Sequence, residues 1–175
     1  MGDIVNFSIR EVMVEDAYEY AACHIACWRA AYNGIIPDDF LDKMASELDQ
    51  RAESCRQTII SPGGYKQFYA EHDGKMVGRL IFSKSRDEDM PDAGEIGAIY
   101  LLEEYWGKGL GLRMMDFAIG MLKRDGHNKF IVWVLEENHR ARRFYEKYGF
   151  SFDGTMKEIT IGKPLIEIRY VKTLV

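Results

Sequence analysis

The sequence predicts an α/β protein with a mixed sheet flanked by helices. Strand-like and helix-like segments alternate along the second half of the chain. Phe130 to Leu135 is continuously apolar, as in a strand covered on both faces. An apolar segment, Ile96 to Leu102, precedes three closely spaced glycines, and an amphipathic helical pattern follows at once. At 175 residues, we expect one domain spanning 1–175.

The first third of the chain is predicted to hold one strand and several helices. Phe7 to Val12 alternates as a short strand does, and a helix is expected from Glu15 or Asp16 through Tyr32. A short helix is expected around 40–44 and another over 46–60, with Ser46 as its N-cap.

A hairpin follows these helices. Gln67 to Glu71 and Met76 to Ser83 are predicted strands around Asp73-Gly74, a dipeptide that favours a tight hairpin turn. A charged loop over 85–92 then leads to the expected central strand, Glu95 to Leu102.

The last third is expected to alternate helix and strand. A helix should run behind the glycines as far as Gly126, and a strand should follow over 130–135. Asn138 to Tyr148 is the next predicted helix, and 150–153 and 165–171 are predicted closing strands.

Composition excludes some classes of protein. No apolar run approaches the roughly 20 residues of a membrane span, and Met1-Gly2-Asp3 does not begin a signal peptide, so a cytoplasmic protein is expected. A net charge of −5 argues against sequence-independent nucleic-acid binding, which depends on neutralising phosphates.

The cysteines are expected to be reduced and structural. Cys23 and Cys27 share one helical face and could form half of a metal site, but no second ligand pair follows. Small buried side chains are the favoured interpretation for these two and for Cys55, and no metal is expected. The four histidines are scattered, with no partner that suggests a nucleophilic triad.

The glycine segment, Trp106-Gly107-Lys108-Gly109-Leu110-Gly111, has the layout of an anion site. The first N–H groups of a helix lack intrahelical partners and lie at the positive end of its dipole. The spacing is not that of a nucleotidase phosphate loop, because Lys108 precedes Gly109 rather than Ser or Thr. Leu112 stands where the dinucleotide fingerprint needs its last glycine.

Ile99-Tyr100-Leu101 through Gly111 resembles the acetyl-CoA motif of the GNAT superfamily of N-acetyltransferases, Arg/Gln-x-x-Gly-x-Gly/Ala after a strand. Asn138 to Phe150 resembles the second motif of that family, Asn-x-x-Ala-x-x-Phe-Tyr-x-x-x-Gly-Phe. The motifs stand in the expected order, and the resemblance covers nearly the whole chain.

The resemblance implies the GNAT fold, a mixed, mostly antiparallel sheet whose two central parallel strands splay apart at the cofactor. It also implies acetyl-CoA as co-substrate. The residues that correspond to its binding site are Ile99, Tyr100, Leu101, Trp106, Gly107, Lys108, Gly109, Leu110, Gly111, Leu112, Asn138, Ala141, Arg142, Phe144 and Tyr145. Asn138 could serve instead, or in addition, as a helix N-cap.

The chain departs from the family at Trp106, which replaces the first Arg or Gln of the motif and so loses a polar contact near the pyrophosphate. Two interpretations are open for several cationic side chains: they form a basic rim near the loop, or they belong to a solvated helix face. These cations are Lys108, Arg113, Arg140, Arg142 and Arg143.

Acetyl transfer to an amine needs a neutral amine, a polarised carbonyl and a stabilised leaving thiolate. Glu95, at the start of the central strand, is the candidate base, although a solvated strand-end acid is an equal alternative. By resemblance, the backbone N–H of Leu101 would polarise the carbonyl. Tyr145 corresponds to the general acid of the family, but its helical spacing also fits a core position.

The expected acceptor is a primary amine of a small molecule or peptide. By resemblance, Trp28 and Tyr32 lie near the acceptor, although two aromatics at this spacing also fit a core. Acidic residues over 87–92 hint at a cationic acceptor. The alternative function is a CoA-binding sensor or regulatory module without turnover. A homodimer is compatible with the resemblance.

Overall fold

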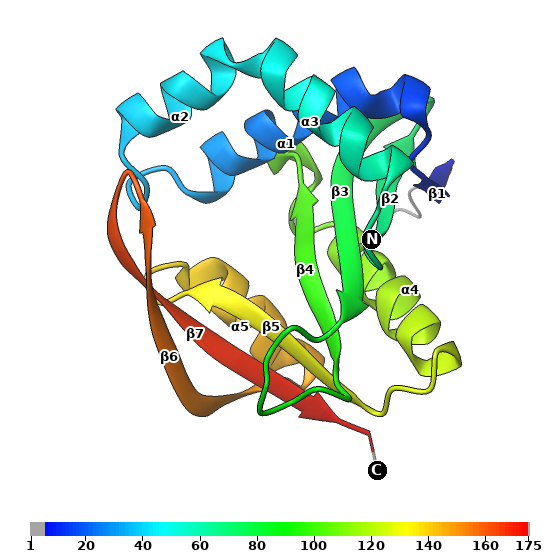
Figure 1. Ribbon diagram of the computed structural model, residues 1–175, viewed down its shortest axis with the longest axis vertical. Helices are drawn as coiled ribbons and strands as arrows, with labels where there is room; N and C mark the ends of the chain where they lie inside the picture. The colour runs from blue at the N-terminus through cyan, green and yellow to red at the C-terminus, as the bar shows by residue number, and fades with distance from the viewer. Residues whose placement is uncertain (1–5, 175) are drawn as a thin grey trace.

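The computed structural model describes residues 6–174, which form a seven-stranded sheet in the order β1-β2-β3-β4-β5-β7-β6. Neighbouring strands are antiparallel except for β4 and β5, which are parallel (Figure 1). The strands are β1 Phe7–Glu11, β2 Lys66–His72, β3 Lys75–Lys84, β4 Gly94–Leu101, β5 Lys129–Leu135, β6 Ser151–Ile161 and β7 Lys163–Thr173.

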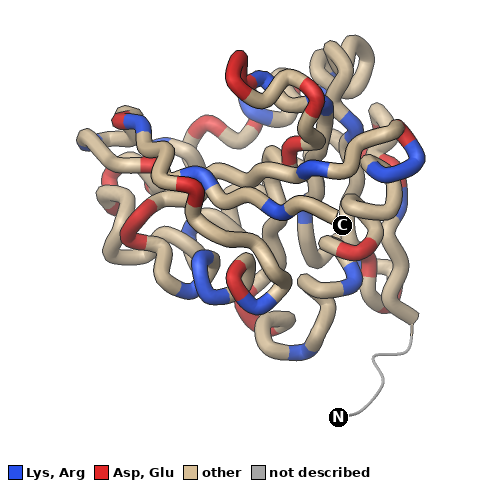
Figure 2. The backbone as a smooth tube through the Cα atoms, turned by 90° about the horizontal axis from the view of Figure 1, so that it is seen from below, with Lys and Arg blue, Asp and Glu red and all other residues tan. Residues whose placement is uncertain are grey.

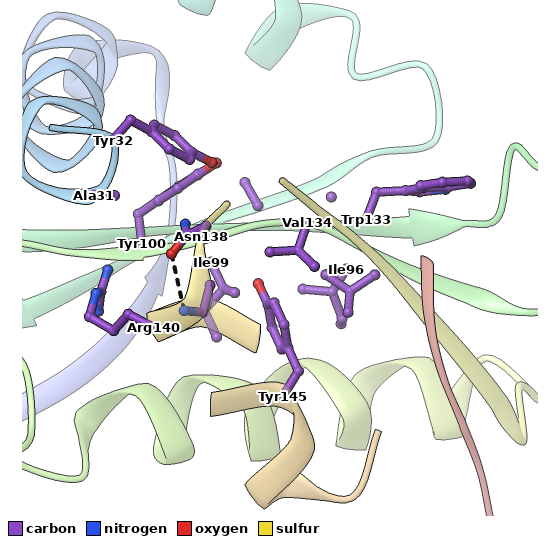
Figure 3. Close-up of a pocket in the computed structure, with 14 residues that line it drawn as sticks. Ala31, Tyr32, Ile96, Ile99, Tyr100, Trp133, Val134, Asn138, Arg140 and Tyr145 are labelled. Carbon is purple, nitrogen blue, oxygen red and sulfur yellow. Dashed lines mark hydrogen bonds between the residues drawn. The ribbon is translucent and has the colours of Figure 1, made fainter. Parts of the chain in front are cut away.

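Helices cover both faces of this sheet. One face carries α1 Ala17–Ala31, α2 Asp38–Ser46 and α3 Leu48–Ile60, and the opposite face carries α4 Leu110–Arg124 and α5 His139–Tyr148 (Figures 1 and 3). Short 3₁₀ turns at Val14–Asp16 and Glu103–Tyr105 precede α1 and the glycine segment. Within residues 6–174, no helix has the length and apolarity that a bilayer span requires.

The buried core likewise forms separate clusters on the two faces of the sheet. One buried cluster joins β3, β4 and β5 to the apolar side of α4, including Met114, Met115 and Leu122. A second cluster packs α1 and α3 on β2 and β3 and contains all three cysteines, which are free and buried. The expectation that the cysteines are small buried side chains agrees with this placement.

The parallel strands β4 and β5 separate along their length. Their register covers only three pairs, from Gly94↔Phe130 to Ile96↔Val132. Gly97 is an extra residue in β4, because Ile96 pairs with Phe82 and Ala98 pairs with Ile81. The bulge turns β4 away from β5, and Figure 1 shows the strands diverging. The predicted mixed, mostly antiparallel sheet with splayed parallel strands is confirmed.

One local prediction was accurate and two were wrong. The Asp73-Gly74 turn has φ of 49° and 74°, as a tight hairpin turn requires. Ser46 is not an N-cap: it ends α2, its hydroxyl donates to the Lys43 carbonyl, and Glu47 occupies the N-cap of α3. The closing strands β6 and β7 are much longer than predicted, because Gly154 lies within β6 and the hairpin turn falls at Gly162.

Candidate active site

The splay leaves two adjoining cavities between β4, β5 and the first turn of α5. They measure about 50 and 70 Å³ and share Ala31, Ile99, Tyr100 and Arg140 as walls. Such narrow spaces suit an extended chain better than a planar ring system. The remaining lining residues are Tyr32, Ile96, Gly97, Ala98, Leu101, Trp106, Gly111, Val132, Trp133, Val134, Asn138, Ala141, Phe144 and Tyr145. Figure 3 shows the residues that line the smaller cavity.

Tyr145 extends from α5 toward the gap between the strands (Figure 3). Its side chain is 7% exposed and its ring packs on Phe144, Phe150 and Tyr170. Its hydroxyl oxygen is not completely enclosed by protein atoms, and it makes no hydrogen bond with residues 6–174. Burial raises the pKa of this phenol, which therefore stays protonated at neutral pH. The ring is a core element while the hydroxyl remains free for a ligand.

The glycine segment forms a concave row of unused N–H groups. Gly107 and Gly109 have φ of 72° and 81°, a conformation that favours glycine. Among the described residues, no protein group accepts from the backbone N–H groups between Gly107 and Leu112. Gly111 lets the first turn of α4 approach α5, since a Cβ there would lie 3.3 Å from the Phe144 ring. This arrangement fits the diphosphate of a CoA donor.

Asn138 is 5% exposed and caps α5 by accepting a hydrogen bond from the Ala141 N–H at 3.1 Å. It also lines the cavity, so the capping and ligand-binding interpretations are compatible. Asn138→Ala should lower the free energy of unfolding by about 1 kcal/mol through loss of the cap. Asn138→Ser should restore most of that stability.

Calorimetric titration of acetyl-CoA into both Asn138 variants checks whether this side chain also binds the donor. If its amide contacts the donor, both variants bind more weakly than the wild type. Wild-type affinity in Asn138→Ser would restrict Asn138 to capping.

An aromatic group closes the cavity on the side of α1. The hydroxyls of Tyr32 and Tyr100 share a hydrogen bond of 2.7 Å, and both rings lie near Trp28. Tyr32 and Tyr100 line the cavity, whereas Trp28 packs behind them and against His24. Tyr32 therefore lies at the site, and Trp28 supports it from the core.

The geometry gives no support to Glu95 as a general base. Its carboxylate is 3% exposed, accepts from the Arg86 guanidinium at 2.5 Å and also accepts from the Arg86 backbone N–H. The hydrogen bond that the Arg86 guanidinium donates to Glu95 raises the pKa of Arg86. Glu95 lies where β4 and β5 still pair, and the cavity begins one residue later, at Ile96. Its role in this structure is to hold the loop after β3.

Several other predicted cofactor residues lie away from the cavity. The Arg142 guanidinium donates to the Tyr170 hydroxyl and the Glu136 carbonyl, so it is engaged on the β7 side of α5. Lys108 is exposed beside the Tyr105 ring, and Leu112 is 46% exposed. For Lys108 and Leu112, only the backbone N–H groups belong to the site.

Of the five cations predicted to form a basic rim around the loop, Arg140 is the one whose side chain lines the cavities. Arg113 stacks on Phe7 and donates to its carbonyl, away from the cavity. Arg140 lines both cavities, and its guanidinium carbon lies 3.4 Å from the centre of the Trp106 ring. In Figure 2, blue and red segments are interspersed, with no extended basic stripe in that view.

Sequence reasoning missed a charged network on the face that also carries α1. Arg169 is 3% exposed and binds the carboxylates of Asp87, Asp89 and Asp153. The Trp133 indole donates to Asp87, and its ring lies 3.8 Å from the Lys157 ammonium. Trp133 in β5 pairs with Arg169 in β7, which places both side chains on one face of the sheet. This proximity can be recognised only when the register of the two strands is known.

The model of the acetyltransferase (GNAT) family matches residues 21–150. A probable N-acetyltransferase of Mycobacterium tuberculosis is 33% identical over 85% of this chain and 82% of its own length. An uncharacterised N-acetyltransferase of Bacillus subtilis is 29% identical over 95% of this chain and 97% of its own. The crystal structure of PaiA N-acetyltransferase from Thermoplasma acidophilum in complex with coenzyme A aligns with a TM-score of 0.77 and 20% identity, covering 97% and 100% of the two chains.

These similarities define the class of protein. The chain belongs to the acetyltransferase (GNAT) family and is an acyltransferase. Family membership supports acetyl-CoA as co-substrate, in agreement with the unused N–H groups of the glycine segment.

Proposed function

We propose that this protein transfers the acetyl group of acetyl-CoA to a primary amine of a small molecule or peptide, by direct attack in a ternary complex. The observation that carries the proposal is the free Tyr145 hydroxyl in the gap between β4 and β5. The glycine segment lies at one end of this gap, and the Tyr32–Tyr100 pair lies on the other face of the sheet. Donor and acceptor can therefore approach from different sides.

Acetyl-CoA supplies a thioester carbonyl, which the amine nitrogen attacks to give a tetrahedral intermediate before the C–S bond breaks. The amine loses a proton to solvent, and the departing sulfur gains or shares one. We infer that a backbone N–H of β4, that of Leu101 by family resemblance, polarises the carbonyl. No side chain is needed for that contact.

Tyr145 is proposed to hydrogen-bond the departing sulfur. An ordinary phenol is a weaker acid than an ordinary thiol by about 1.5 pKa units, or about 2 kcal/mol. Because burial raises the pKa of Tyr145 further, complete proton transfer to the thiolate becomes still less favourable. A hydrogen bond that stabilises the thiolate avoids that cost.

The charges of the acceptor face favour a cationic amine. Three carboxylates surround the single guanidinium of Arg169, which leaves this region with excess negative charge. The Lys157 ammonium lies over Trp133 and 3.3 Å from the Glu167 carboxylate. A second alkylammonium group would find the same chemistry there.

Neutralising such an amine at pH 7 costs about 4.6 kcal/mol for a lysine-like pKa of about 10.4. The rate should therefore rise with pH between 7 and 9, as the neutral fraction of the acceptor increases.

Initial rates at varied acetyl-CoA and varied amine test the ternary complex. Direct attack predicts double-reciprocal lines that intersect. Parallel lines would indicate a covalent acetyl-enzyme and contradict the proposal. Tight binding of acetyl-CoA without transfer to any member of a broad amine panel would favour the sensor alternative.

A further inference from the structure

Trp106 is held in a fixed orientation at the end of β4. Its indole N–H donates to the Leu101 carbonyl at 2.8 Å, across the turn that leads to the glycine segment. In the family motif this position carries Arg or Gln, so the chain has exchanged a polar side chain for an aromatic surface. The exchange would remove a contact to the donor unless another residue supplies it.

Arg140 reaches that aromatic surface from α5. Its guanidinium carbon lies 3.4 Å from the ring centre of Trp106, a stacking distance. A guanidinium stacked on a ring keeps its N–H groups in its own plane, where they can still donate. In Figure 3, Arg140 points away from Tyr145, toward the Ala31 side of the cavity. It therefore lies at the end of the channel away from the reacting groups.

Among the described residues Arg140, like Arg79, Arg113 and Arg142, has no carboxylate partner, but of these four it is the one that lines both cavities. Arg86, Arg169 and Arg10 each bind a carboxylate. Within residues 6–174, Arg140 makes no salt bridge and donates no hydrogen bond to a protein group. Burial lowers the pKa of Arg140, and the negative charge of Glu103 opposes this shift without forming a salt bridge. A positioned cation without a partner beside a row of unused N–H groups is suited to a phosphate.

We propose that Arg140, stacked on Trp106, supplies the charged contact to the diphosphate of the donor that position 106 itself no longer provides. This inference rests on the proposed function, because it takes acetyl-CoA as the donor. The contact joins the first turn of α5 to the glycine segment at the start of α4. The unused N–H groups of 107–112 and the guanidinium then hold one diphosphate from two sides.

Calorimetric titration with acetyl-CoA and with S-acetylpantetheine, which lacks phosphates, tests the inference. Arg140→Met keeps the aliphatic stem and removes the charge. A charge-assisted hydrogen bond contributes about 1.5 to 3 kcal/mol, so the Kd for acetyl-CoA should rise about 10- to 150-fold. The Kd for S-acetylpantetheine should stay within about 2-fold. Arg124→Met, at the opposite end of α4, is the matched control and should leave both values unchanged.

Removing the ring tests the stack. Trp106→Leu should weaken acetyl-CoA binding, because the guanidinium loses its support, and should lower the dependence of Kd on salt as Arg140→Met does. The inference would be overturned if Arg140→Met lost the same affinity for both ligands, or lost no affinity for either. The proposed function would remain intact in both cases. If the wild type bound no acetyl-CoA, the proposed function would fail, and this inference would fail with it.

Discussion

A Tyr145→Phe variant should turn over about 10- to 150-fold more slowly than the wild type, with little change in the KM for acetyl-CoA, because it loses a hydrogen bond to the departing thiolate. The ring contacts with Phe144, Phe150 and Tyr170 do not involve the hydroxyl, so the variant should fold and melt as the wild type does. The lost hydroxyl makes no hydrogen bond with residues 6–174. A fall in kcat without a fall in melting temperature would therefore report chemistry rather than packing.

The pH profile adds a second readout to this experiment. Because burial raises the pKa of Tyr145, deprotonation of this phenol should not limit the wild-type rate between pH 7 and 10. Tyr145→Phe should lower kcat by a similar factor across that range. Wild-type turnover in the variant would remove Tyr145 from the mechanism and leave it as a core residue.

An Arg169→Gln variant should lose about 3 to 5 kcal/mol of stability at neutral pH, because one buried guanidinium forms ion pairs with three neighbouring carboxylates that would otherwise repel one another. The loss corresponds to a fall in melting temperature of roughly 10 °C. Urea unfolding of the variant and the wild type measures it. The matched control is Arg10→Gln, whose exposed pair with Glu71 should contribute little.

The pH dependence of this loss follows from the direction of the pKa shifts. The hydrogen bond from Arg169 lowers the pKa of Asp89. Burial would raise the pKa of Asp153, but hydrogen bonds from the Thr155 backbone and Arg169 outweigh it and lower the pKa. A depressed carboxylate pKa stabilises the fold above the unfolded value of about 3.9 and ceases to do so as the pH falls through the folded value.

The stability difference between the wild type and Arg169→Gln should therefore be largest near pH 7 and shrink below about pH 4. A difference that grows on acidification would show that these ion pairs do not stabilise the fold as described.

Features encoded by short segments were predictable from the sequence. The turn at Asp73-Gly74 and the N-cap at Asn138 each depend on a few adjacent residues, whose conformational preferences are intrinsic. The splay of β4 and β5 was expected from family resemblance, and the bulge at Gly97 accounts for it in the structure.

Features that depend on which side chain faces which neighbour were not predictable. Arg140 and Arg142 are two residues apart on α5, so they face different directions: Arg140 lines the cavity, whereas Arg142, the residue that the family motif suggested, bonds to Tyr170. Glu95 was assigned to the site because its partner, Arg86, lies in the preceding loop, where no pattern signals an ion pair. The length of β6 was missed because a glycine within a strand resembles a turn.

The measurement that tests the central claim most directly is the release of CoA thiol from acetyl-CoA, with and without a primary alkylamine, together with quantification of the N-acetylated product. The account predicts amine-dependent release, one acetylated amine for each CoA, and loss of most of this rate in Tyr145→Phe. Release that is independent of the amine, or binding of acetyl-CoA without any release across a broad panel of amines, would contradict it.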